Sequence, residues 1–285
     1  MNSRSAYLFL LPAMVIYVAF VAIPIAQVFF FSFFAWDNGL MQGFVGLQNY
    51  GRLWTDGVFW AAIGHNAIWV VLTLAFPLLA GLLLAAILSE RSARVIRWMS
   101  AIYFIPRTIP LVVAGIIWSW IYNPLFGLLN FVLGAVGLGN WAGAWLADES
   151  TALISLNVVG VWTFFGFCTV IYLAAIQAID PALYEAAELD GASWWRKFRD
   201  LTVPLLKPST LFLGLYAAIE AMRFFDLIWV TTQGGPGYAT EVLTTHIYKT
   251  FFLMGDFGYA SVLSVVLLAI VLSLSAIAFR VLRAK

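Results

Sequence analysis

Six long apolar stretches constrain this chain more than any other feature of its sequence. A helix needs roughly 20 predominantly apolar residues to cross a bilayer, and each stretch is long enough to form such a span. They cover about residues 7–34, 62–88, 100–121, 152–178, 209–231 and 258–280. No length remains for a soluble domain, so the sequence predicts a single all-α transmembrane domain over residues 1–285.

The composition indicates lipid as the main solvent of the chain. Hydrophobic residues make up 63% of it and charged residues only 10%, more apolar surface than one soluble core can hide. The first stretch exceeds the roughly 7–15 residue core of a signal peptide, so we expect a retained span. The formal net charge of +1 gives no reason to expect nucleic acid as a partner. The single cysteine, Cys168, cannot form an internal disulfide and leaves the redox compartment open.

The positions of Lys and Arg predict how the helices are oriented. With the N-terminus inside, 11 of the 15 lie in segments on the inner side. Only Arg52 and Lys249 fall in outer loops, whereas Arg107 and Arg223 fall at or within spans. Because cationic loops stay in the cytoplasm, both termini are predicted to be cytoplasmic.

The loop between the fourth and fifth spans concentrates charge: residues 185–206, EAAELDGASWWRKFRDLTVPLL, hold seven of the 29 charged residues. Pro181 suits a first helical turn, Glu185 and Glu188 favour its N-terminal half, and Gly191 can end it. A short cytoplasmic helix over residues 181–193 is therefore expected. Composition alone leaves open a second interpretation, an amphipathic loop lying on the bilayer.

The spacing in this loop resembles the EAA loop of ABC importer permeases. Glu185-Ala186-Ala187 is followed after three residues by Gly191, after nine more by Leu201, and then by Val203 and Pro204. In that family the loop forms a coupling helix that docks on the cytoplasmic ATPase. The resemblance implies a coupling loop over residues 181–204, with ATPase contacts at Tyr184, Glu185, Ala186, Ala187, Leu189, Asp190, Gly191 and Ala192.

A second motif resembles the signature of carbohydrate-uptake permeases related to the first maltose permease and the glycerol-3-phosphate permease. It is FDLIWVTTQGGPGYATEVL, residues 225–243. Gly234, Gly235 and Pro236 are expected to form a tight outer turn, with Thr240 and Glu241 beyond it. These outer-loop residues are the second group of predicted site residues, after those of the coupling loop.

The resemblance implies the MetI-like permease fold, in which the first helix wraps a partner permease and five helices form the core. It also implies a multi-pass protein of a bacterial or archaeal cytoplasmic (inner) membrane. The expected partners are a second homologous permease, two cytoplasmic ABC ATPases, an extracytoplasmic solute-binding protein and a carbohydrate substrate such as an oligosaccharide, a glycoside or a sugar-phosphate-like solute.

Neither catalysis nor a cofactor is predicted for this chain. No G-x-x-x-x-G-K-[ST] sequence occurs, so ATP and its Mg²⁺ are expected on the partner ATPases. His65 and His246 are isolated and lack metal-ligand spacing. Asp56 is expected to face water.

Alignment with the related maltose permease implies a substrate site on the two spans that flank the coupling loop. Its sugar contacts fall on Gly160, Thr163, Phe164, Phe167, Ala217, Glu220, Ala221 and Phe224. Both sets run i, i+3, i+4, i+7, which places each on one helical face, as a site between helices near the membrane midplane requires. The aromatic rings are expected to stack on sugar and Glu220 to accept hydrogen bonds from hydroxyls. The alternative is that these side chains only pack helices together.

The two intramembrane arginines need partners. A charge near the bilayer centre costs at least about 2.5–3.5 kcal/mol, so each should face protein or water. Arg223 lies three residues after Glu220 and three before Asp226, which predicts pairing within its own helix. The alternative, which adds Arg223 to the predicted substrate site, is that one arginine binds an anionic group of a phosphate- or sulfonate-bearing glycoside.

The sequence gives less support to three other functional classes. A permease for amino acids or ions is disfavoured by the motif around Gly234. An ion-coupled secondary transporter needs coupling carboxylates, and Glu220 and Asp226 are the only plausible intramembrane acids. A membrane enzyme is disfavoured because the sequence contains no paired-aspartate motif, no metal cluster and no nucleophile with a base.

Overall fold

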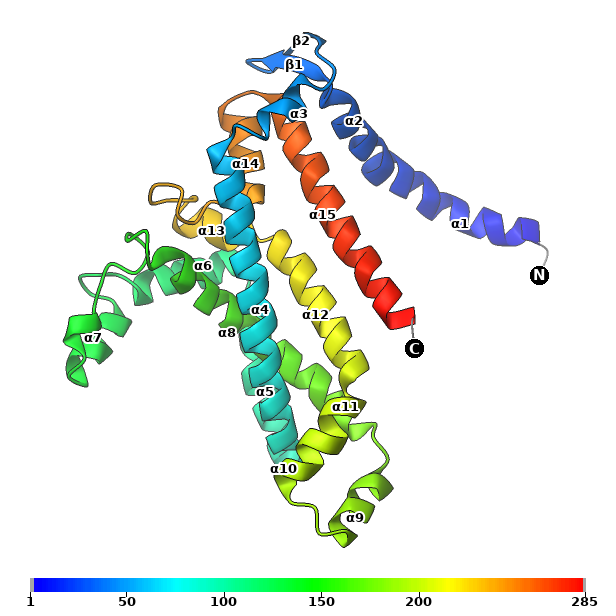
Figure 1. Ribbon diagram of the computed structural model, residues 1–285, viewed down its shortest axis with the longest axis vertical. Coiled ribbons are helices and arrows are strands. Elements are labelled where there is room, and N and C mark those ends of the chain that lie inside the picture. Colours follow the sequence, from blue (N-terminus) through cyan, green and yellow to red (C-terminus); the bar gives the residue numbers. More distant parts are fainter. Residues whose placement is uncertain (1–2, 284–285) are drawn as a thin grey trace. The chain divides into compact units, whose positions relative to one another are not determined.

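The computed structural model describes residues 3–283 and is mostly helical (Figure 1). The chain divides into two compact units. The hairpin unit comprises Met1–Trp60 and His246–Ile270, and the core unit comprises Ala61–Thr245 and Val271–Lys285. Residues 1–2 and 284–285, which the predicted domain includes, lie outside the described residues.

The hairpin unit begins with a continuous run of helical backbone. It consists of α1 (Ser3–Tyr17), a π-helical segment (Val18–Ala22) and α2 (Ile23–Phe31). No residue of the apolar span Phe9–Phe31 is buried inside the protein. A helix that is apolar all round and packs on little of its own chain must find lipid or another protein.

A β-hairpin follows this helix, so the all-α prediction was too strict. β1 (Phe34–Asp37) and β2 (Leu40–Phe44) pair antiparallel, with Asp37 opposite Leu40. Asn38 and Gly39 connect them with φ of 48° and 79°. Positive φ at both positions is what a type I′ turn requires, and Asn-Gly is its preferred sequence. The Asn-Gly pair is therefore a hairpin signal that the all-α prediction left out.

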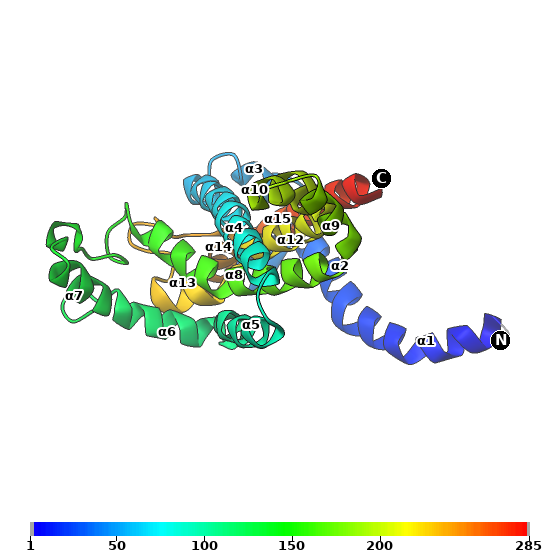
Figure 2. The same ribbon diagram turned by 90° about the horizontal axis from the view of Figure 1, so that it is seen from below.

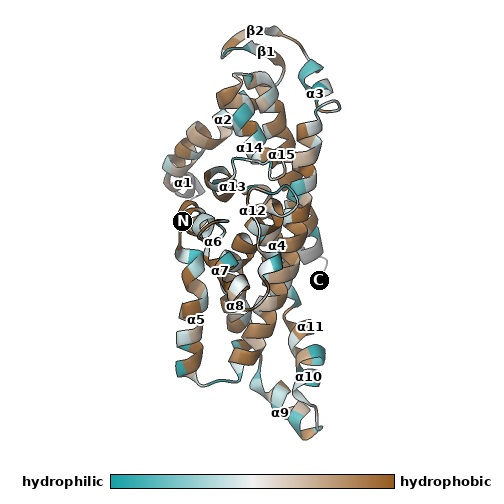
Figure 3. Ribbon diagram, turned by 90° about the vertical axis from the view of Figure 1, so that its left-hand side faces the viewer, coloured by the Kyte–Doolittle hydropathy of each residue, from teal (hydrophilic) through white to brown (hydrophobic). Residues whose placement is uncertain are grey.

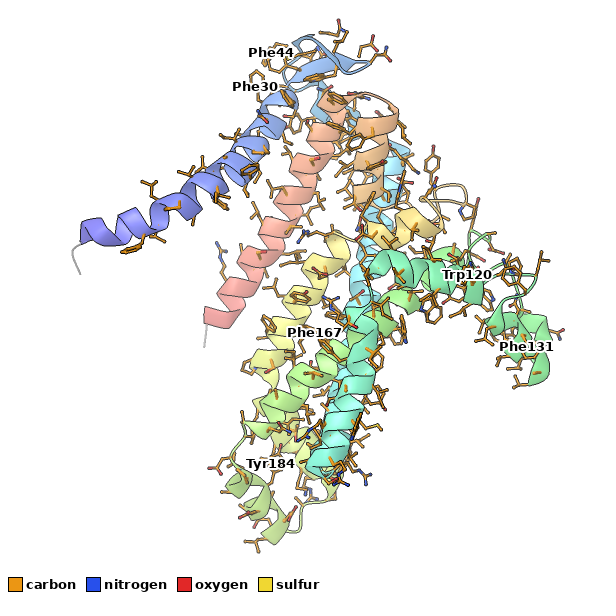
Figure 4. All side chains as sticks on the ribbon, turned by 180° about the vertical axis from the view of Figure 1, so that it is seen from behind. Phe30, Phe44, Trp120, Phe131, Phe167 and Tyr184 are labelled. Atoms are coloured by element: carbon orange, nitrogen blue, oxygen red, sulfur yellow. The ribbon has the colours of Figure 1, made fainter. Side chains whose placement is uncertain are left out.

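Aromatic rings hold the hairpin to the end of α2. The Phe34 ring lies 4.6 Å from the Phe30 ring and 5.5 Å from the Phe44 ring, between centroids. Figure 4 shows Phe30 and Phe44 close together at this end of the unit. The hairpin therefore has a small apolar base of its own.

A charged network ties α3 (Gln48–Arg52), the start of α4 (Gly57–Ser89) and the start of α15 (Phe257–Arg283) together in the hairpin unit. Asp56 Oδ2 accepts hydrogen bonds from Tyr259 Oη at 2.6 Å and lies 2.9 Å from His246 Nε2. Arg52 donates to Asp256 at 2.7 Å. Asp56 therefore does not simply face water, as its loop position had suggested.

The same contacts set the acidity of Asp56, which lies just before the span. Burial by itself raises the pKa of this carboxyl, but hydrogen bonds from Tyr259, the Phe59 N–H and His246 together outweigh burial. The pKa therefore lies below its ordinary value of 3.8. Asp56 is held ionised as the N-terminal cap of α4, because its Oδ1 accepts from the N–H groups of Val58 and Phe59.

The core unit is a set of helices that continue from α4. Their bounds are α5 (Ala93–Thr108), α6 (Leu111–Ile121), α7 (Leu128–Ala135), α8 (Ala152–Gln177), α9 (Pro181–Leu189), α10 (Trp194–Lys197), α11 (Val203–Leu205), α12 (Lys207–Met222), α13 (Asp226–Thr231) and α14 (Leu243–Tyr248). Short helical segments also cover Gly139–Trp141, Phe198–Thr202 and, in the hairpin unit, Lys249–Leu253. α5 and α12 pack on α8, and α6 packs on α13 (Figure 2).

Backbones approach closely where α5 meets α8. Gly166 of α8 lies against the carbonyl of Tyr103, so a Cβ there would overlap that group. Small residues allow such approaches in membrane helices. α8 is the most enclosed of the long apolar helices, with 56% of its most apolar window buried.

The predicted span over residues 100–121 is bent. α5 and α6 meet at Ile109 and Pro110 with an angle of 94° between them. Ile109 is extended, with φ −77° and ψ 126°, because a residue before proline is disfavoured in the helical region. The stretch 209–231 is likewise divided, since α12 ends at Met222 and α13 begins at Asp226.

Four helices in residues 3–283 are long and apolar enough to cross a membrane. They are Phe9–Phe31, Gly57–Ser89, Ala152–Gln177 and Phe257–Ile277, and the bent pair α5 and α6 adds a fifth if it is one span. Several apolar helices are thus present. The count of six spans and the cytoplasmic position of the termini stay predictions.

Two apolar clusters stabilise the core unit. The first includes Phe164, Tyr172 and Ala217, and the second includes Trp69 and Ala221. Figure 3 shows α4 and α8 as mainly hydrophobic, whereas α10 carries hydrophilic residues. The predicted substrate residues lie where the two clusters adjoin on α8 and α12.

Candidate functional site

The predicted coupling helix forms, and local signals explain both of its ends. Asp180 Oδ1 accepts a hydrogen bond from the Ala182 N–H at 3.0 Å, and Pro181 occupies the first helical position. At the other end Gly191 has φ +73°. The N–H of Gly191 bonds to the Glu188 carbonyl and that of Ala192 to the Ala187 carbonyl, the Schellman pattern that ends a helix.

One face of α9 packs on its own chain. Tyr184 and Ala187, with Ala192 just beyond the helix, are half-buried. The Tyr184 hydroxyl lies 2.9 Å from Thr202 Oγ1, and Lys197 donates to Glu188 at 2.6 Å. Tyr184, labelled in Figure 4, is therefore a residue that holds α9 in place.

The other face of α9 is open. Glu185, Ala186, Asp190 and Gly191 are exposed, and the Leu189 side chain is 89% exposed. An isolated exposed leucine needs no explanation, but here it lies on a helix beside two carboxylates and a small residue. This arrangement can dock in a cleft that is apolar in its centre and polar at its rim. Five of the eight predicted coupling residues lie on this face.

The predicted tight turn after α13 is present. Gly234 has φ +86°, the Gly235-Pro236 bond is cis, and Thr240 Oγ1 donates to the Gly235 carbonyl at 2.7 Å. Thr240 and Glu241 are fully buried. The Glu241 carbonyl lies 2.8 Å from His65 Nδ1 of α4, so the segment beyond the turn is tied to that helix.

Six of the predicted substrate residues line one cavity in the core unit. They are Gly160, Thr163 and Phe164 of α8 and Glu220, Ala221 and Phe224 in or after α12. Trp69 and Thr73 of α4 and Arg107 of α5 complete the lining. Residues from four segments thus converge on a cavity of about 20 Å³.

The other predicted substrate residues lie elsewhere. Ala217 is fully buried in the first apolar cluster. The Phe167 ring, labelled in Figure 4, lies 5.7 Å from that of Phe164 and 5.4 Å from that of Tyr216, beside the cavity. Arg223 is exposed at the end of α12 and does not line the cavity.

The pairing of Arg223 with Glu220 or Asp226 was predicted wrongly. Within residues 3–283 the charged partner of Glu220 is Arg107, with Nη2 3.8 Å from Oε2. No ion pair of Arg223 occurs in this part of the chain. The physical reason is that α12 ends at Met222 and Arg223 is its non-helical cap, while Asp226 begins another helix, so the i, i+3 geometry is lost on both sides of Arg223.

Aromatic rings and one hydroxyl hold Arg107. Its guanidinium carbon lies 5.6 Å from the centre of the Phe164 ring, 5.5 Å from that of Phe167 and 5.8 Å from that of Tyr216. Its Nη2 also donates to the Tyr216 hydroxyl at 2.7 Å. The faces of aromatic rings attract cations, so this intramembrane charge is stabilised by protein, as expected.

Sequence reasoning missed three contributors to the cavity. Arg107 carried a signal, since it is a lone charge in an apolar stretch, but its place beside Glu220 is not visible in the sequence. Trp69 and Thr73 look like ordinary helix-packing residues. The Trp69 ring lies 4.5 Å from the Phe224 ring, a contact between residues about 155 positions apart.

Asn157 is a further polar residue that the sequence did not single out. It lies on α8, three positions before Gly160 and therefore on the same helical face. Its side chain is 2% exposed, and neither its Oδ1 nor its Nδ2 has a hydrogen-bond partner. A buried amide without partners is unusual and marks this face of α8 as polar beyond the cavity.

Residues 3–283 contain no group of three or more His, Cys, Asp or Glu side chains placed to hold a metal ion.

Comparison with known families is decisive for the class of protein. Residues 77–284 match the family described as "Binding-protein-dependent transport system inner membrane component". The chain belongs to that family. This permease is therefore an inner-membrane component of a transport system.

Individual relatives are similar over almost the full length of this permease. The probable ABC transporter permease protein YurN of Bacillus subtilis is 38% identical over 278 residues, covering 96% of this chain and 94% of the relative. The trehalose/maltose transport system permease protein MalF of Thermococcus litoralis is 32% identical over 283 residues, covering 98% and 94%.

A solved structure shares the fold. It is described as a bacterial ABC transporter involved in the import of the acidic polysaccharide alginate, and one of its chains superposes with a TM-score of 0.83 at 25% identity. The match covers 98% of this permease and 96% of that chain. The mostly helical, MetI-like permease fold is thus shared over nearly the whole length.

Proposed function

We propose that this permease forms one half of the translocation path of a carbohydrate importer. The observation that carries the proposal is the cavity of the core unit, in which aromatic rings lie beside a hydrogen-bond donor, Arg107, and an acceptor, Glu220. Rings that stack on sugar faces and polar groups that bind hydroxyls are what a carbohydrate site needs. The trehalose/maltose and alginate systems among its relatives support this substrate class.

A second permease is expected to supply the other half of the path. A cavity of about 20 Å³ holds one water-sized group and cannot enclose a sugar ring. The side chains of Arg107 and Glu220 are 25% and 36% exposed, so the cavity opens at the surface of the chain. A homologous permease that closes this surface would complete the site. The unburied apolar helix Phe9–Phe31 offers a further face for that partner.

Coupling to ATP is assigned to α9. Its open face, with Leu189 between exposed carboxylates, would dock on a cytoplasmic ATPase, and the two ATPases would bind ATP and Mg²⁺. Closure of the ATPases would pull on α9 and shift the permease pair between inward-facing and outward-facing states. A solute-binding protein on the outer side would deliver the substrate.

The test is ATP-dependent uptake by the intact assembly. The permease is purified with its partners and reconstituted into liposomes with ATP inside and a solute-binding protein outside. Import of at least one radiolabelled oligosaccharide or glycoside, stopped by vanadate, is the expected result. Copurification without any ATPase, or uptake that an ion gradient drives without ATP, would contradict the proposal and favour a secondary transporter.

A further inference from the structure

We propose that Arg107 and Glu220 together bind a single uncharged hydroxyl group of the substrate, so that the sugar unit entering this half-site is neutral. Arg107 is then a specificity-determining residue of the permease. The inference rests on the proposed function, because it names the class of substrate for the same cavity. The inference also decides which kind of substrate group Arg107 binds. That group is a hydroxyl rather than an anion.

The distance between the two side chains fits a shared oxygen atom. Arg107 Nη2 and Glu220 Oε2 are 3.8 Å apart, too far for a hydrogen bond between them. An oxygen about 2.8 Å from each would form a compact triangle with the two atoms. A hydroxyl can fill that position, because it accepts from the guanidinium and donates to the carboxylate at the same time. A carboxylate or sulfate oxygen has no proton to donate to Glu220.

The size of the cavity agrees with this assignment. At about 20 Å³ it accepts one water-sized group between Trp69, Phe164 and Phe224. A hydroxyl has one non-hydrogen atom, whereas a carboxylate has three and a sulfonate or phosphate has more. A charged group would therefore require the rings to move apart.

The charge balance points the same way. Arg107 and Glu220 are the two charged side chains among the residues that line the cavity, and they have opposite signs. An anion bound by Arg107 would lie beside the Glu220 carboxylate, and like charges at that distance repel strongly when partly desolvated. The third charge nearby along the chain, Arg223, is exposed and outside the lining.

The position of Arg107 is fixed before substrate binds. Its Nη2 donates to the Tyr216 hydroxyl, and the Tyr216 ring stacks on that of Phe164 at 6.0 Å with 11° between the planes. A guanidinium has five N–H groups in a rigid fork, and the bond to Tyr216 leaves others for a ligand. The same rings offer faces on which a neutral sugar unit can stack.

The experiment measures equilibrium binding of sugars to the purified assembly, trapped with ADP and vanadate and without its solute-binding protein. The neutral probes are radiolabelled maltose and trehalose, and the acidic probe is digalacturonate. Two variants are compared with the wild type: Arg107→Lys, which keeps the charge but loses the fork, and Glu220→Gln, which keeps the shape but loses the charge. Arg91→Gln, an exposed arginine between α4 and α5, is the matched control.

The wild type is expected to bind at least one neutral disaccharide at least tenfold more tightly than digalacturonate. Arg107→Lys should weaken neutral binding at least tenfold. Glu220→Gln should do the same and also raise the relative affinity for digalacturonate, because the arginine is then uncompensated. Arg91→Gln should match the wild type.

Three results would overturn the inference. The first is a wild-type preference for digalacturonate. The second is that both variants keep the wild-type affinities and the wild-type preference. The third is that neither variant assembles with the ATPases, which would give Arg107 and Glu220 a purely structural role. If the wild type imports sugars under ATP in the uptake assay but the variants behave like it, only this inference fails. If the wild type transports no sugar, the proposed function fails as well.

Discussion

The predicted coupling helix α9 and the central cavity belong to the same core unit but are built in opposite ways. α9 is defined by neighbours in the sequence, since Asp180 caps one end and Gly191 closes the other. The cavity is defined by residues from α4, α5, α8 and the end of α12, which lie up to 155 positions apart. One region presents an open surface, and the other holds polar groups between apolar helices.

The difference teaches how each region should respond to substitution. In α9, a change alters a short segment that the rest of the unit does not depend on. Around the cavity, a change disturbs the packing of several helices at once. Four substitutions test this contrast, from the largest expected effect to the smallest.

Gly166→Val tests the tight packing beside the cavity. A side chain at this position would overlap the Tyr103 carbonyl of α5, and a backbone group cannot move aside cheaply. We expect the free energy of unfolding to fall by about 3 kcal/mol or more, measured as a loss of thermal stability and of yield in detergent. Gly64→Val on α4 is the control, because nothing lies within 4 Å of a Cβ there. Equal stability of the two variants would contradict the description of α8 as closely packed.

Gly191→Val tests the coupling surface. The left-handed backbone at φ +73° costs a non-glycine residue only about 1–2 kcal/mol locally, so the fold should survive. ATP-driven uptake is nevertheless expected to drop at least tenfold, since the helix end and its docking face shift. Gly191→Asn is the control, because asparagine tolerates this conformation. Normal uptake by the valine variant would remove Gly191 from the coupling residues.

Tyr184→Phe tests the buried side of α9. The variant loses the hydrogen bond to Thr202 but keeps the ring. A loss of about 1 kcal/mol is expected, seen as faster amide hydrogen exchange in residues 181–189 with the rest of the core unit unchanged. Faster exchange throughout α8 would mean that the helix is more strongly coupled to its neighbours than the contacts indicate.

Arg199→Gln should have the smallest effect. Arg199 donates hydrogen bonds to Asp200 at 2.7 and 3.2 Å, and these lower the pKa of Asp200 below its ordinary 3.8. A lowered pKa contributes stability above pH 3.8 that is lost as the pH falls through the lower folded value. The substitution should return the pKa toward 3.8, measured by NMR titration. Both side chains are exposed, and solvent screens their attraction, so the free energy of unfolding at neutral pH should stay unchanged.

Local features were predictable because their causes are local. The helix over residues 181–189, its glycine end and the turn at Gly234 follow from proline, glycine and capping residues in the sequence. The β-hairpin at Asn38-Gly39 was equally predictable, because its turn signal is local, but the all-α prediction left it out. The bend at Pro110 also has a local cause, although its angle of 94° does not follow from the sequence.

The sequence by itself determined that this chain is a membrane protein of apolar helices and that its charged loop forms a helix, whereas the pairing of two faces on α8 and α12 was implied by the resemblance to the maltose permease. Helical periodicity and backbone capping act over a few residues, so the sequence displays them directly. Only the tertiary structure decided that Arg107 lies opposite Glu220, that Trp69 and Thr73 join them, and that Arg223 does not. Those contacts depend on where separate helices cross, and helix crossings are set by the packing of whole apolar faces rather than by any short motif.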